Sequence, residues 1–63
     1  MSVETQHLAR VVRALLNGYQ HPWHDEGFLR DMLGFLLQQK AITIRQKDRI
    51  REIVERVNQR EER

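Results

Sequence analysis

The sequence predicts an all-α fold, a small three-helix bundle with helices over about residues 3–17, 25–40 and 43–60. Apolar residues recur at three- and four-residue spacing in each segment, and the connections between the segments are short. The middle segment is apolar over more than half of its circumference. We therefore expect it to be the central helix, covered on two sides by helices of the same chain or completed by homodimerisation.

The first helix is indicated by apolar residues that follow one another at a spacing of 3, 1, 3, 1, 3, which places them on one side of a helix. Ser2 precedes this pattern and is the candidate N-cap. Asn17 and Gly18 supply a stop signal, because glycine readily takes the left-handed conformation that ends a helix. The apolar side consists of Leu8, Val11, Val12, Leu15, Leu16 and Tyr19.

The second predicted helix, residues 25–40, carries apolar side chains over an arc of about 200° at 100° per residue. Asp25 is its candidate N-cap, and Glu26 is favourable beside the positive end of the helix dipole. An arc this wide needs two neighbours. It consists of Phe28, Leu29, Met32, Leu33, Phe35, Leu36 and Leu37.

The third helix begins at a capping-box pattern, in which Thr43 caps the first turn and Gln46 reaches back to the cap amide. Its apolar stripe is only about 100° wide, as in a helix on the periphery of a bundle. The connection "KAIT" is so short that the second and third helices should be antiparallel neighbours. We expect one domain, residues 1–63, with a frayed tail over 59–63. The stripe is Ile50, Ile53, Val54 and Val57.

Chain length, the absence of cysteine and the lack of long apolar segments restrict what kind of protein this is. A core built from 63 residues is marginal without further support, and the absence of cysteine excludes disulfides and thiolate zinc sites. No segment has the length of a signal peptide's apolar run or of a membrane span, so we expect a cytoplasmic protein with no membrane contact.

Catalysis is not expected. The only serine is Ser2, and the chain has neither a glycine-rich phosphate loop nor an H-E-x-x-H pair. Asp25 and Glu26 are adjacent, and neighbouring side chains on a helix diverge instead of facing one substrate. The sequence therefore predicts no enzyme and no cofactor.

The stretch "GYQHPWHDEG", residues 18–27, contains a candidate set of metal ligands. His21 and His24 precede two carboxylates, a donor set that zinc, nickel or copper accepts. The two histidines straddle Pro22 without the i, i+4 register of a helical metal site, and no third separated cluster completes a tetrahedron. We therefore predict a turn that starts the second helix and no metal.

The aromatic residues of the same stretch have two interpretations. Tyr19 and Trp23 either cover one end of the core as a lid or expose an edge that anchors a partner. On the second interpretation the chain is a protein-protein interaction module, an adaptor, antagonist or regulatory subunit, that binds a partner protein and also self-associates. The candidate contact residues are Tyr19, Trp23, Phe28, Phe35 and Leu37.

Nucleic-acid binding through the third helix is the alternative. Residues 40–63 carry eight Lys or Arg against five acids. Five of the arginines gather within an arc of about 60°, namely Arg45, Arg49, Arg56, Arg60 and Arg63. Acidic residues border this ridge, and Glu52 precedes Arg56 at the favourable ion-pair spacing, so a solvated surface competes with a phosphate-binding one. The candidate residues are Arg45, Arg49, Arg56 and Arg60.

Two stretches resemble known families. "AITIRQKDRIREIV" resembles the opening scaffold helix of LuxR-type helix-turn-helix domains at Ile42, Thr43, Arg45 and Gln46. The recognition helix that would follow is missing, so the resemblance does not extend to DNA reading. Residues 28–57 resemble helix-pair segments of small phage and mobile-element proteins. This resemblance implies a phage or mobile-element origin, although the motif that carries it is a generic helix-capping pattern.

Overall fold

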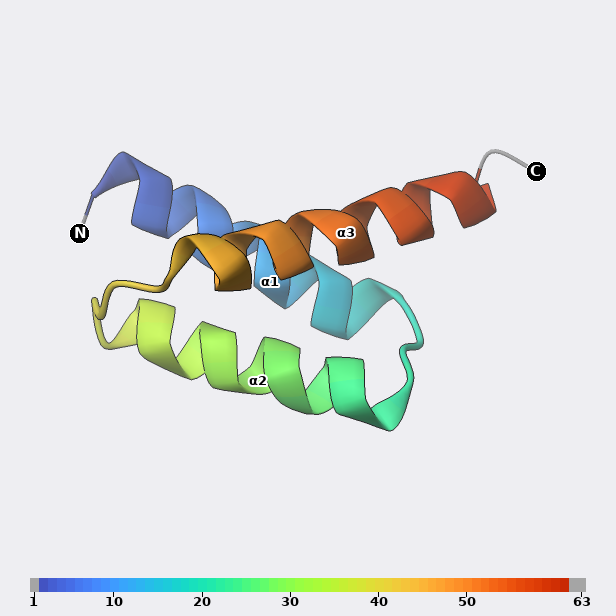
Figure 1. Cartoon of the computed structure of the whole chain (residues 1–63), viewed down its shortest axis with the longest axis horizontal. Coiled ribbons are helices and arrows are strands. Elements are labelled where there is room, and N and C mark those ends of the chain that lie inside the picture. Colours follow the sequence, from blue (N-terminus) through green and yellow to red (C-terminus); the bar gives the residue numbers. More distant parts are fainter. Residues whose placement is uncertain (1, 62–63) are drawn as a thin grey trace.

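Three helices make up most of residues 2–61, the part of the chain that the structure, a computed structural model, describes. They are α1 (Val3–Gly18), α2 (Trp23–Leu37) and α3 (Ile44–Glu61). α2 runs antiparallel to α1 and α3, and the three pack into one bundle (Figure 1). The predicted all-α, three-helix fold is confirmed.

The N-terminal end of α1 is capped as the sequence predicts. The amide of Thr5 donates to the Ser2 hydroxyl oxygen over 3.1 Å, and the amide of Gln6 donates to the Ser2 carbonyl over 3.0 Å. The helix includes Gly18, and the chain turns extended at Tyr19. α1 thus ends one residue beyond its predicted end at residue 17.

The predicted start of α2 at Asp25 is wrong by two residues. Pro22 is the N-cap residue, and its carbonyl accepts the amides of Asp25 and Glu26, each over 3.0 Å. Proline lacks an N–H and its φ is held near −65°, so it suits a helix start, where amides have no partner in the helix. The side chain of Asp25 makes no cap and turns toward α3 instead.

α2 also ends three residues before its predicted end at residue 40. Gln39 has a φ of 60°, its amide donates to the Leu36 carbonyl over 3.0 Å, and the Lys40 amide donates to the Phe35 carbonyl over 2.9 Å. These two bonds are those of a Schellman motif. A left-handed residue stops the helix here, although glutamine, and not glycine, occupies the position.

Replacing Gln39 with glycine is expected to raise the free energy of unfolding by about 0.5–1 kcal/mol, because glycine takes this φ without the cost that a side chain adds. Chemical denaturation measures the change. Gln38→Gly is the matched control, since Gln38 has a φ of −84° and glycine gains nothing there. Equal effects of the two substitutions would show that the left-handed residue carries no strain.

The predicted capping box of α3 is confirmed in both directions. The Gln46 amide donates to the Thr43 hydroxyl oxygen over 3.1 Å, and the Thr43 amide donates to the Gln46 side-chain oxygen over 2.7 Å. The helix continues to Glu61, so the described part of the tail predicted to fray, residues 59–61, is helical. Residues 62–63 lie outside the described residues.

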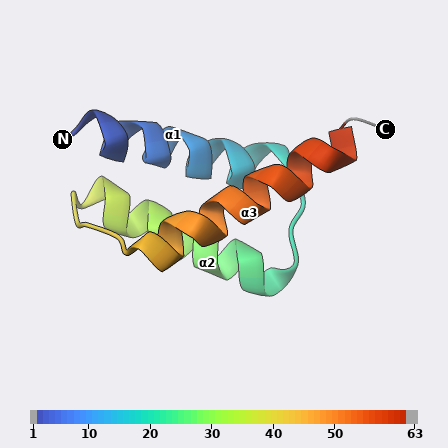
Figure 2. The ribbon, with the colours of Figure 1, turned by 45° about the horizontal axis from the view of Figure 1, so that its top comes forward.

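The core lies where the three helices meet. α2 contacts both neighbours, as predicted for the central helix, but it packs more closely along α1 than against α3 (Figure 2). None of the described helices combines the length and the apolar character that crossing a membrane requires. The buried apolar residues are Ala9, Val12 and Leu15 of α1, Leu29, Met32 and Leu36 of α2, and Ile50, Ile53 and Val57 of α3.

Candidate functional site

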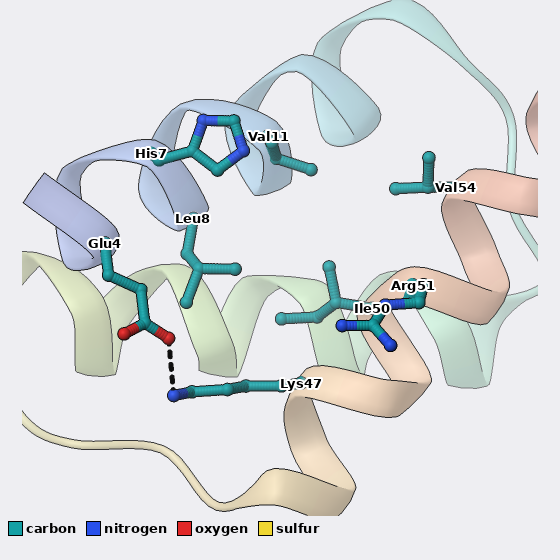
Figure 3. Close-up of a pocket in the computed structure, with 8 residues that line it drawn as sticks. All are labelled: Glu4, His7, Leu8, Val11, Lys47, Ile50, Arg51 and Val54. Atoms are coloured by element: carbon teal, nitrogen blue, oxygen red, sulfur yellow. Dashed lines mark hydrogen bonds and ion pairs between the residues drawn. The ribbon is translucent and has the colours of Figure 1, made fainter.

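An open apolar groove runs between α1 and α3. Its walls come from residues at the same spacing on the two helices, positions 4, 7, 8 and 11 of α1 and positions 47, 50, 51 and 54 of α3, and its volume is about 350 Å³. Figure 3 shows the apolar side chains of both helices directed into the space between them. The apolar lining is Leu8, Val11, Ile50 and Val54.

The groove exists because α1 and α3 are not in close contact along their length. Each packs on α2, while their own backbones approach one another at few points (Figure 2). Ile50 is buried at the base, whereas Leu8, Val11 and Val54 stay half-buried because no side chain of the described residues covers them. The apolar side chains of α1 and α3 therefore line a groove that stays partly exposed.

Charged side chains line the edges of this groove. Lys47 Nζ donates to Glu4 Oε1 over 2.6 Å, which ties the start of α1 to the first turns of α3 (Figure 3). This hydrogen bond and the ammonium charge lower the pKa of Glu4 below its ordinary value. His7 and Arg51 are exposed on the α1 and α3 edges. The edges of the groove therefore carry one acidic residue, two basic residues (Lys47 and Arg51) and one histidine.

Asp25 forms a second cluster, on the other side of α3. Its carboxylate is buried, with Oδ2 2.9 Å from Arg56 Nη1 and Oδ1 3.4 Å from Arg49 Nη2. The Arg49 guanidinium also lies over the ring of Phe28, 4.3 Å from its centroid, a cation–π contact. One carboxylate from α2 thus holds two arginines from α3.

This cluster changes the interpretation of the arginine ridge. Arg56 pairs with Asp25 and not with Glu52, and Arg60 donates to the Gln20 carbonyl over 3.4 Å. Three of the four candidate nucleic-acid-binding arginines therefore contact the start of α2 and the loop before it, while Arg45 is exposed near the beginning of α3. Arginines engaged within the chain are less available to phosphates, which weakens the case for nucleic-acid binding.

The five candidate protein-binding residues do not form one patch. Trp23 is 85% exposed on the first turn of α2, which excludes the lid interpretation for its side chain, and Tyr19 is 38% exposed in the preceding loop. Phe28 is half-buried beneath Arg49. Phe35 and Leu37 are exposed at the opposite end of α2, with Lys40 Nζ 5.6 Å from the Phe35 ring centroid.

His21, in the loop before α2, and His24, in the first turn of α2, have separate structural contacts. His21 donates from Nε2 to the Leu15 carbonyl over 2.8 Å, which closes the end of α1. His24 packs edge-on against Trp23, with 5.7 Å between ring centroids. Among the side chains that the structure describes, no three histidines or carboxylates come together in a way that could hold a metal ion.

Sequence reasoning missed both the groove and the partners of Asp25. A signal for the groove was present, since the spacing i, i+3, i+4, i+7 occurs on both helices with apolar residues beside charged ones. No such local signal identifies Asp25, because its partners lie 24 and 31 residues along the chain. Comparison with protein-family models, curated proteins and solved structures finds no match to this chain.

Proposed function

We propose that the chain is a small cytoplasmic protein-interaction module that binds an amphipathic helix of a partner protein in the groove between α1 and α3. The observation that supports this most is the half-buried strip of Leu8, Val11 and Val54, held open between two helices. Helices commonly dock their apolar face into a groove of this kind. By binding this helix, the chain would cover a surface of the partner protein and so serve as an adaptor, antagonist or regulatory subunit.

The dimensions and charges of the groove define the partner. A cavity of about 150 Å³ holds a benzene ring, so 350 Å³ takes about two large apolar side chains, such as those one turn apart on a helix. Arg51 and His7 at the edges favour acidic residues on the flanks of that helix. We therefore expect an acidic amphipathic helix with two apolar anchors at i and i+3 or i+4.

Site-specific photo-crosslinking in cells tests this proposal. A photoreactive amino acid at Val11, in the groove, is expected to capture a partner, whereas the same group at Gln6, exposed on α1 outside the groove lining, is not. Val54→Glu is expected to reduce capture by at least about tenfold, because it places a carboxylate against the apolar anchors.

The matched control is Gln59→Glu, which adds the same charge at an exposed position of α3 outside the groove. It should leave capture unchanged, and circular dichroism should show that both variants keep their helices. Equal capture from Gln6 and Val11, or capture insensitive to Val54→Glu in a folded chain, would contradict groove binding.

A further inference from the structure

The ion pair between Glu4 and Lys47 lies at one end of the groove, where α1 and α3 begin (Figure 3). A second hollow of about 170 Å³ adjoins the groove at this end, and the two share Glu4, Leu8 and Lys47 in their linings. The rest of the second lining comes from the start of α1, the end of α2 and the loop before α3. A helix that continues from the groove into the second hollow therefore passes the ion pair.

The lining residues of α1 and α3 form three successive levels along the groove, of which two are apolar and the third is charged. Neighbouring levels are three or four residues apart on each helix, which is about one helical turn. A partner helix that sets two apolar anchors on the apolar levels therefore places a third residue, one turn farther on, over the charged level. The levels are Val11 with Val54, Leu8 with Ile50, and Glu4 with Lys47 (Figure 3).

The charges around the ion pair indicate which residue this third one is. Lys47 and Arg51 outnumber Glu4 in the lining of the groove, and Lys40 and Lys47 outnumber Glu4 in the lining of the second hollow. An acidic side chain complements both hollows. Lys47 Nζ already donates to Glu4 over 2.6 Å, however, and a second carboxylate beside it would meet the negative charge of Glu4. The two carboxylates therefore compete for one ammonium group.

We propose that Glu4 is an internal competitor of the partner's helix, and that a carboxylate on this helix, one turn beyond its second apolar anchor, displaces Glu4 from Lys47. This inference rests on the proposed function, because it concerns a helix bound in the same groove. The side chain of Glu4 is 65% exposed, so it can turn into solvent without disturbing the core. Apolar anchors hold the helix in the groove, and Glu4 sets how strongly an acidic helix binds.

Crosslinking from the photoreactive amino acid at Val11 tests this inference, with the yield of captured partner compared at equal levels of the chain. Glu4→Gln is expected to raise the yield about two- to fivefold, the range that one exposed ion pair contributes, because the partner's carboxylate no longer has a competitor. Lys47→Gln is expected to lower the yield by a similar factor, because Glu4 then faces the partner's carboxylate without a cation between them. The double variant should lie between the two.

An ion pair with a purely structural role predicts a different pattern. If Glu4 and Lys47 only hold α1 and α3 in place, either substitution breaks the same contact. Both single variants would then shift the yield in the same direction, and the double variant would match them. That pattern would overturn the competition and leave binding in the groove intact.

Glu52→Gln and Arg13→Gln are the controls, since each removes one charge at an exposed position outside both hollows. Neither should change the yield, and circular dichroism should show that all variants keep their helices. Changes equal to those at Glu4 and Lys47 would show a general effect of net charge and overturn the inference. No capture from Val11 in the otherwise unmodified chain would instead overturn groove binding itself, and the competition with it.

Discussion

Replacing Leu29 with alanine is expected to lower the free energy of unfolding by about 3 kcal/mol. Leu29 lies at the middle of α2, where it is 0% exposed among residues of all three helices. Truncating a buried leucine loses its transfer free energy and leaves a cavity, which together cost about 2–5 kcal/mol. A chain of 63 residues has a total stability on the order of 3–9 kcal/mol, so this single change removes a large part of it.

Urea denaturation followed by circular dichroism measures this loss. Leu37→Ala is the matched control, because it removes the same atoms from the same helix at a position that is 50% exposed. We expect it to cost less than about 1 kcal/mol when both variants are measured at one low protein concentration. A similar cost at the two positions would mean that α2 is not the central helix of the core.

The three helices could be predicted because the signals that specify them are local. Ser2 caps α1 and Thr43 with Gln46 caps α3 through contacts within three residues, so the relevant pattern is contiguous in the sequence. The apolar spacing of each segment is equally local. The predicted apolar sets contain eight of the nine buried apolar residues of the described chain, all but Ala9, but they also contain Tyr19, Phe35 and Leu37, which are exposed. Element order and the central place of α2 follow from these signals and the short connections.

The ends of α2 were predicted less well because tertiary contacts and an unusual backbone residue decide them. Asp25 has a high local preference for the N-cap position, but its carboxylate binds two arginines of α3 instead. At the other end Gln39 takes the left-handed conformation that the sequence pattern reserves for glycine or asparagine. Neither outcome is encoded in the neighbouring residues.

The prediction of the candidate sites was limited because a helical wheel does not show how one helix packs against another. A wheel places Arg49 and Arg56 on one ridge, yet it does not show that this ridge faces the start of α2. It likewise does not show that α1 and α3 stand apart and leave Val11 and Val54 partly uncovered. Positions along one helix are predictable, while the spacing between helices requires the packed structure.

Replacing Asp25 with asparagine is expected to lower the free energy of unfolding by about 2 kcal/mol. The substitution keeps the shape of the side chain but removes the charge that two guanidinium groups bind, and hydrogen bonds to charged groups contribute about 1.5–3 kcal/mol. The side chains of Arg49 and Arg56 are 44% and 50% exposed, so water can solvate both guanidinium groups after the carboxylate is lost. The loss of stability is therefore smaller than for a fully buried ion pair.

Asp48→Asn is the control, because Asp48 is exposed on α3 and should change the stability by no more than about 0.5 kcal/mol. A double-mutant cycle with Arg56→Met separates the ion pair from other effects of losing the carboxylate, such as its interaction with the dipole of α2. Because α3 has few close backbone contacts with α2, amide hydrogen exchange in Asp25→Asn should accelerate more in α3 than in α1. A coupling energy near zero, or equal acceleration in both helices, would show that Asp25 does not hold α3 in place.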